Sequence, residues 1–416
     1  MEQLAEIFRT IINIGATALL PIIIFILGLI FRMKIGEAIK SGLTVGIGFM
    51  GLSLVVNLLT SSLKPAVDYY SKLGSGYTIT DIGWPAIGAA SWVAPFAGLA
   101  ILLGILINIV LVRTGLTKTM NVDIWNYMHF LIPGALAYVL FNNFWIGLVV
   151  TVLMSIAALF IGDKLAKKWE DYFGLEGTTC TTIIYTAWVI PFSWLVNKLI
   201  DIIPGLNKID FSLKDANKHL GIFGDSSIIG TIVGLLLAVL THQGLANTVN
   251  MAIGIASVMV LMPKMVSVLM EGISPVGKAA RTTMSKQLGE KADLHIGMDI
   301  ALGLGDPTTE TATVITIPLV ILCALFLPNI KLFPVGLLMS IIYISVAGSL
   351  VTKGNLFRTV LIGTIFCAIT LYLEAWVAPG ATQMIKAGGV KVSSLSSDLT
   401  LSEPWNLLIY WLRTVF

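Results

Sequence analysis

Two carboxylates stand beside a proline in the second half of this apolar chain, in the segment 302–314, LGLGDPTTETATV. Asp306 precedes the proline, and Glu310 follows Asp306 by one helical turn. A charged side chain deep in an apolar medium costs about 2.5–3.5 kcal/mol on membrane-insertion scales, so we expect both carboxylates to have a use. Ionised carboxylates accept strong hydrogen bonds from hydroxyl groups. With the hydroxyl of Thr308, they predict a binding site for a hydroxylated small molecule.

Both carboxylates have alternatives to substrate binding. Asp306 can cap the helix that follows it, and Glu310 can face a cytoplasmic loop. A catalytic use is also open, because a carboxylate can take the proton from a bound hydroxyl group. Asp306 and Glu310 are therefore candidates for substrate binding and for the base.

A second polar pair lies in the apolar run 124–136, IWNYMHFLIPGAL. Asn126 and His129 are separated by three positions, so they share one face of a helix. We predict that both contact the substrate, with His129 as a third candidate base. The alternative is a structural histidine whose hydrogen bonds are satisfied inside the protein.

Four further residues complete the predicted site. Asp81 and Trp84 lie in DIGWPAIGAASW, where the indole ring can stack on the C–H face of a sugar or simply pack. His242 and Gln243 lie at a predicted hairpin between two spans, as substrate contacts or as a polar turn. The sequence contains no phosphate-binding loop and no metal-ligand spacing, so no metal or cofactor is predicted.

The composition decides the class of protein, because 56% of the residues are hydrophobic and only 12% are charged. Long stretches lack Asp, Glu, Lys and Arg, and continuous apolar runs exclude a transmembrane barrel. These stretches are residues 10–31, 41–63, 82–112, 124–162, 177–197, 226–263, 311–330 and 332–352. We predict an all-α polytopic protein of the lipid bilayer with about 10–11 transmembrane helices. The net charge of +3 indicates no nucleic-acid partner.

The two halves of the chain resemble each other in three segment pairs that occur in the same order. The pairs are 44–67 with 251–276, 81–106 with 299–325, and 142–153 with 354–365. Glycine and proline interrupt 81–93 and 296–310, which predicts a re-entrant hairpin in each half, because irregular backbone at membrane depth must line a cavity or lie within protein.

Basic residues indicate that the second half is inverted relative to the first. Loops rich in Lys and Arg are predicted to be cytoplasmic. They are residues 32–40, 113–123, 163–177, 278–291 and 353–358, which leaves the N-terminus outside. The inversion requires that 179–203 make no net crossing, so we predict a re-entrant or interfacial segment there. If 179–203 spans, the symmetry fails or 278–291 faces outward.

Four stretches together resemble a known family over nearly the whole chain. They are NIGATALLPIIIFILGLIFRMKIGEAIKSGLTVGIGFMGL, DIGWPAIGAASW, THQGLANT and DIALGLGDPTTETA. The chain resembles the galactitol-type IIC membrane subunits of the bacterial phosphoenolpyruvate-dependent sugar phosphotransferase system and, more distantly, the ascorbate transporters of the same superfamily.

The resemblance implies a homodimeric permease in the bacterial inner (plasma) membrane. Such a permease translocates galactitol or a related polyol, which a cytoplasmic IIB protein phosphorylates after charging by IIA. The subunit carries no phosphoryl group itself, and its own part in the chemistry is left open. The resemblance also implies that the hairpins, His129 and the pair His242–Gln243 line or neighbour the substrate.

The same resemblance predicts how the chain is divided into scaffold and core. The first repeat is 1–162, with scaffold 1–75 and a core 76–162 that contains the hairpin 81–93. A linker, 163–225, leads to the second repeat, 226–385, with scaffold 226–295 and a core 296–385 that contains the hairpin 296–310. The tail is 386–416.

Two other functions remain open at this stage. An ion-coupled secondary transporter of a polyol or sugar acid would use the same site without chemistry. An intramembrane enzyme would use His129 with a carboxylate and would turn over substrate without net transport.

Overall fold

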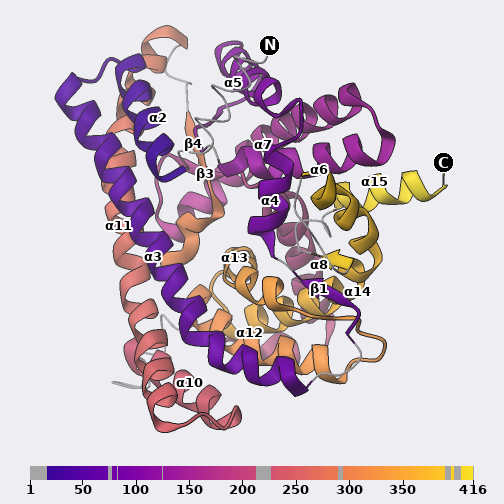
Figure 1. Cartoon of the computed structure of the whole chain (residues 1–416). Coiled ribbons are helices and arrows are strands. Elements are labelled where there is room, and N and C mark those ends of the chain that lie inside the picture. Colours follow the sequence, from indigo (N-terminus) through magenta and orange to yellow (C-terminus); the bar gives the residue numbers. More distant parts are fainter. Residues whose placement is uncertain are drawn as a thin grey trace.

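The computed structural model describes residues 16–73, 77–81, 83–123, 125–211, 226–288, 294–388, 395–397 and 404–415, which are mostly helical (Figure 1). This confirms the predicted all-α polytopic class. The start of the predicted first repeat (1–15), residues 212–225 of the predicted linker and residues 389–394, 398–403 and 416 of the predicted tail lie outside the described residues.

Long apolar helices dominate the described part of the chain. Four of them there are long and apolar enough to cross a membrane by length and composition. They are α7 (Phe144–Phe173), α11 (Leu245–Leu288), α12 (Pro307–Phe326) and α14 (Leu356–Ala387). Shorter apolar helices are α2 (Ala16–Ile30), α5 (Ala97–Arg113), α6 (Trp125–Phe141), α10 (Ser226–Leu240) and α13 (Val335–Thr352).

The predicted scaffold is built on two long helices, α3 (Ile35–Leu73) and α11, which lie side by side (Figure 1). Their backbones approach closely at Gly48, where an added Cβ would lie 2.6 Å from the backbone nitrogen of Leu269. The turn that precedes each of these helices is hydrogen-bonded to the other helix. In the turn before α11, Gln243 Nε2 donates to the carbonyl of Pro65 on α3 at 3.2 Å. At the opposite end, the hydroxyl of Thr283 donates to the carbonyl of Phe31 at 2.9 Å.

Two small parallel sheets connect the halves of the rest of the molecule. In one, β1 (Ile79–Asp81) lies between β5 (Leu332–Phe333) and β6 (Leu395–Ser397). In the other, β4 (His295–Met298) lies between β2 (Thr119–Asn121) and β3 (Thr178–Cys180). Each central strand comes from one predicted half of the chain and pairs with one strand of the other half. Its second partner lies in the segment that follows that other half, which is the linker for β3 and the tail for β6. This reciprocal exchange is what two equivalent halves would produce, and the duplication stays a prediction.

Each central strand leads directly into a predicted hairpin. After β1 comes the short helix α4 (Trp84–Trp92), and after β4 comes the 3-10 helix η4 (Ile300–Gly305). The sheets therefore fix where both hairpins begin. The predicted hairpin 296–310 consists of β4, η4 and the first turn of α12.

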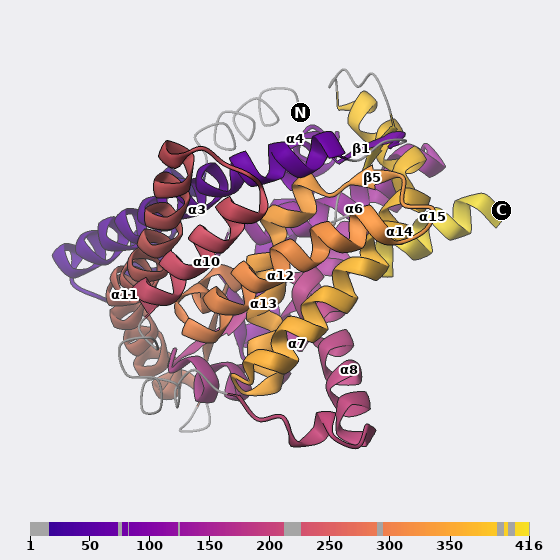
Figure 2. The same cartoon turned by 90° about the horizontal axis from the view of Figure 1, so that it is seen from below.

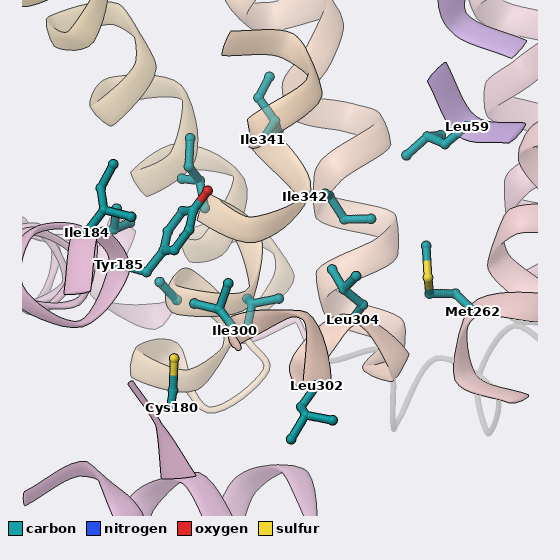
Figure 3. Packing of buried hydrophobic residues seen from close by; sticks show 14 of the residues in the cluster. Leu59, Cys180, Ile184, Tyr185, Met262, Ile300, Leu302, Leu304, Ile341 and Ile342 are labelled. Carbon is teal, nitrogen blue, oxygen red and sulfur yellow. The ribbon is translucent and has the colours of Figure 1, made fainter. Parts of the chain in front are cut away.

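The second hairpin is buried among apolar side chains (Figure 3). Ile300, Leu302 and Leu304 are each no more than 3% exposed. They belong to the same cluster as Ile341 of α13 and Met262 of α11. Irregular backbone at this position is thus enclosed by protein, as a re-entrant segment in a membrane requires.

The segment 179–203 begins in β3 and continues as the π-helix η1 (Tyr185–Val189) and α8 (Ile190–Ile202). Figure 2 shows α8 projecting from the main body. The last helix, α15 (Pro404–Val415), is fixed to α6 by Arg413, whose Nε donates to the carbonyl of Leu140 at 2.9 Å.

Candidate functional site

Asp306 occupies the N-cap position of α12. Its backbone is extended (φ −83°, ψ 124°), and its Oδ2 accepts from the backbone nitrogen of Thr309 at 2.9 Å and from the Thr309 hydroxyl at 3.1 Å. An aspartate cap followed by proline at the first helical position is a strong local signal for a helix start. The same Oδ2 also accepts from the hydroxyl of Tyr172 on α7 at 3.1 Å.

Hydroxyl groups surround this cap on neighbouring helices. The Thr309 hydroxyl lies 3.1 Å from Oγ of Ser349, and the Thr308 hydroxyl donates to the carbonyl of Gly354 at 3.3 Å. A Cβ added to Gly354 would lie 3.0 Å from the Tyr172 hydroxyl, so the turn before α14 touches α7. We call Tyr172, Asp306, Thr308, Thr309, Ser349 and Gly354 the Asp306 cluster.

Glu310 lies one turn further along α12, is only 2% exposed, and faces no open loop. Neither of its carboxylate oxygens has a hydrogen-bond partner among the described residues. The positive end of the helix dipole stabilises a negative charge in this first turn. A buried charged acceptor without a donor is nevertheless unfavourable, by about 1–3 kcal/mol or more. The two oxygens of Glu310 are therefore buried acceptors that no described donor satisfies, and substrate binding by Glu310 stays a prediction.

Asn126, on α6, belongs to a second hydrogen-bonded cluster with side chains of β2 and of the segment after β3, and His129 lies one turn further along α6. Asn126 is fully buried; its Nδ2 donates to Asn121 Oδ1 and to the Thr181 hydroxyl, both at 2.9 Å. Its Oδ1 accepts from the Thr182 hydroxyl at 2.9 Å. The ring of His129 packs edge-to-face on Tyr185, with 6.4 Å between centroids.

This second cluster also holds the start of the second hairpin. Asp299 caps η4, accepting from the backbone nitrogen of Ala301 at 2.8 Å, and its Oδ2 lies 3.0 Å from the Thr182 hydroxyl. The backbone nitrogen of Asp299 in turn donates to Asp123 Oδ2 at 3.1 Å. Asn126 thus acts through Thr182 on the hairpin that leads to Asp306.

Asp81 lies at the start of the first hairpin, as Asp299 lies at the start of the second. Its carboxylate accepts from the backbone nitrogens of Gly83 at 3.1 Å and Leu337 at 2.9 Å, the latter in the first turn of α13. Gly336 is required there because any Cβ would collide with Asp81 Oδ1. Trp84 is the first residue of α4, and its side chain lies outside the described part of the structure.

His242 and Gln243 lie at the exposed turn between α10 and α11, on the predicted scaffold. The ring of His242 lies 5.8 Å from that of Tyr69 near the end of α3. Gln243 bonds to the Pro65 and Thr241 carbonyls. The structure therefore places this pair with the scaffold hairpin and not within either polar cluster.

Sequence reasoning missed Tyr172, Ser349, Thr182, Asp123 and Asp299. Only Asp299 had a usable signal, because the dipeptide Asp-Ile begins both predicted hairpins. Within the described residues, no group of three or more His, Cys, Asp or Glu side chains could hold a metal ion. What the Asp306 cluster and Glu310 offer is a set of hydroxyl donors and carboxylate acceptors.

Comparisons with known proteins identify the family of this chain. Residues 10–394 match the profile of a family described as "PTS system sugar-specific permease component". The chain is 34% identical over 396 residues to the "PTS system galactitol-specific EIIC component" of Escherichia coli (strain K12), covering 94% of this chain and 87% of that protein. The protein of the same description from Escherichia coli O157:H7 gives the same values. A "Putative permease IIC component" of strain K12 is 29% identical over 401 residues, 96% of this chain and 91% of that protein.

Proposed function

Because the chain belongs to the family of sugar-specific permease components of the PTS system, which are multi-pass proteins of the bacterial inner membrane, we propose that it binds galactitol or a related polyol and translocates it for phosphorylation by a cytoplasmic IIB protein. The similarity to galactitol-specific relatives supports the substrate class. The observation that carries the proposal is the buried Glu310 carboxylate, which lacks hydrogen-bond donors among the described residues beside a cluster of hydroxyl groups.

A polyol is a chain of hydroxyl groups, each of which needs an acceptor once it leaves water. Glu310 supplies two carboxylate oxygens, and hydrogen bonds to an ionised acceptor are roughly twice as strong as neutral ones. Asp306 is engaged differently, because its Oδ2 already accepts from Thr309 and Tyr172. We therefore assign direct hydroxyl binding to Glu310 first and the positioning of α12 to Asp306.

Phosphorylation traps the substrate in the cytoplasm. The oxygen of a polyol hydroxyl forms a bond to the phosphorus of the phosphorylated IIB protein. The bond from phosphorus to the IIB side chain breaks, and its electron pair stays on that side chain. The hydroxyl proton passes to a base, for which Glu310 is the first candidate and His129 the alternative. IIA then recharges IIB. The cysteines of this chain are not placed as carriers, since Cys180 and Cys367 are buried and Cys323 is partly buried.

The architecture of two inverted repeats in a homodimer belongs to the same proposal. The reciprocal exchange of strands between the sheets supports the repeats. Exposed apolar side chains along α3, among them Leu43, Ile47 and Leu54, support a scaffold face that a second copy or lipid covers.

The test is galactitol phosphorylation by the purified chain in vesicles with phosphorylated IIB. We expect radiolabelled galactitol to bind the chain alone and to accumulate as its phosphate only when IIB is present. Uphill uptake by the chain alone under a proton or sodium gradient would contradict the proposal. Glu310→Gln should lower binding, whereas Glu37→Gln, at an exposed carboxylate of α3, should leave it unchanged.

A further inference from the structure

The turn before α14 joins the Asp306 cluster to a segment of the linker. Asn355 caps α14, with its Oδ1 accepting from the backbone nitrogen of Arg358 at 3.0 Å. Its Nδ2 donates to the carbonyl of Ile209 at 3.0 Å and to Asp210 Oδ1 at 3.1 Å. The backbone nitrogen of Leu356 donates to the carbonyl of Phe211 at 2.7 Å. Residues 209–211 are therefore held against the turn that contains Gly354, whose carbonyl contacts Thr308.

Several side chains of this turn and segment are exposed, whereas Asn355 is buried. Ile209 is 37% exposed and Phe211 is 42% exposed, and Lys208 and Lys353 are exposed as well. We call Lys208, Ile209, Phe211 and Lys353 the docking ridge. Exposed Asn207 and Asp210 interleave with the apolar residues, which is unlike a lipid-facing surface. The predicted cytoplasmic side of the basic loop 353–358 places the ridge in the compartment of the phosphoryl donor.

Phosphoryl transfer restricts where that donor can bind. The attacking oxygen and the phosphorus must approach to about 3–3.5 Å, so the donor must touch the rim of the substrate site. On the α7 side, the exposed residues near Tyr172 carry both signs of charge, including Lys168 and Asp171, so this side does not select a phosphoryl group. On the ridge side, Lys208 and Lys353 attract it, and Lys353 directly precedes Gly354 of the Asp306 cluster.

We propose that the docking ridge is the surface on which the phosphorylated cytoplasmic donor protein binds, with Ile209 and Phe211 as apolar anchors and Lys353 facing the phosphoryl group. This inference rests on the proposed function. Apolar anchors, one of them aromatic, within a polar rim are an arrangement that specific protein interfaces use.

The test is the rate of galactitol phosphorylation as phosphorylated IIB is titrated against Phe211→Ser and Lys353→Glu. Each variant should raise the KM for IIB by about tenfold, the worth of one good interface contact. The galactitol Kd measured without IIB should stay within about twofold in both variants, because neither side chain touches the proposed substrate position. Phe211→Ser should also leave kcat within about twofold, whereas Lys353→Glu should lower kcat as well, because Lys353 faces the phosphoryl group. Phe211→Leu and Lys353→Arg should restore most of the wild-type KM.

The control is Leu116→Glu, at a side chain that is 62% exposed in the turn after α5 and also predicted to be cytoplasmic. If Leu116→Glu raises the KM for IIB and the ridge variants do not, the donor binds elsewhere and the inference is overturned. If a ridge variant loses galactitol binding, the alkylation rate of a cysteine introduced at position 209 is measured instead. Phosphorylated IIB should slow this alkylation. Equal alkylation rates with and without IIB would overturn the inference. Failure of the wild type to phosphorylate galactitol would instead reject the proposed function.

Discussion

The hydroxyl of Tyr172 donates to Oδ2 of Asp306 at 3.1 Å and thereby ties the end of α7 to the start of α12. These residues lie 134 positions apart in the sequence. The contact brings the carboxylate predicted from the GLGDPTTET segment against a loop predicted to be cytoplasmic. It also explains how a helix start inside the protein is held in place by a second helix.

Loss of this contact should destabilise the protein. Tyr172→Phe keeps the ring and removes the donor to a carboxylate, so unfolding should become easier by about 1–3 kcal/mol. Thermal unfolding in detergent measures the change. The matched control is Tyr372→Phe, which removes an exposed hydroxyl that donates to the carbonyl of Pro328 at 2.9 Å. An equal loss of stability in both variants would mean that the Asp306 contact contributes no more than the exposed hydrogen bond of Tyr372.

Substrate binding should depend most strongly on Glu310. Glu310→Gln keeps the shape and replaces one acceptor by a donor, so the galactitol Kd should rise roughly ten- to hundredfold. Isothermal titration or radioligand binding measures it. Membrane insertion and dimerisation should be unchanged, because removing a buried charge is favourable in lipid. Normal binding by this variant would move the site to the neighbourhood of Asn126 and His129.

Two substitutions of Asp306 should distinguish its role as a helix cap from the contribution of its negative charge. Asparagine caps helices as well as aspartate does, so Asp306→Asn should fold and insert. Uptake should still fall, because the amide is a weaker acceptor for Tyr172, whose hydrogen bond positions α12 against α7. Asp306→Ala also removes the cap and should lose about 1 kcal/mol or more of stability in addition. Comparing uptake with thermal unfolding for the pair distinguishes the two effects. Equal stability of the two variants would argue against the cap.

The Asn126 network should be needed for stability. Asn126→Leu removes one hydrogen bond from each of Thr181, Thr182 and Asn121, although each of them keeps another partner, and this should cost about 1–3 kcal/mol. Asn247→Ala, which removes an exposed amide bonded to Gln243 Oε1 at 3.0 Å, is the control. Thermal unfolding should show the loss in the first variant and little change in the second. No loss in Asn126→Leu would show that the remaining hydrogen bonds of Thr181, Thr182 and Asn121 are sufficient.

Labelling of introduced cysteines tests the membrane topology. A cysteine at 35–38, at 166–168 or at 284–288 should be protected from an impermeant thiol reagent added outside, whereas one at exposed Asn142 should react. The distribution of basic loops motivates this expectation. Labelling from outside at 284–288 would end the inverted-repeat interpretation.

Local patterns in the sequence were enough for the class of protein and for several details. Long charge-free runs indicate helices in a bilayer because each backbone group must be satisfied within its own segment. Asp306 before Pro307 predicts a helix start because a cap bonds only two or three residues ahead. Each of these signals involves residues that are close together in the sequence, so it can be recognised without the tertiary structure.

Only the tertiary structure decided which polar residues meet. The sequence suggested one site for Asp306, Glu310, Asn126 and His129, whereas the structure forms two clusters and puts His242 and Gln243 on the scaffold hairpin. Thr182 meets Asp299 across 117 positions, and β4 pairs with strands of the other predicted half. Such contacts depend on how helices pack and where backbones exchange strands, which no local periodicity encodes. The sequence therefore determined that the chain forms helices suited to a lipid bilayer. The packing of distant segments determined which polar residues meet.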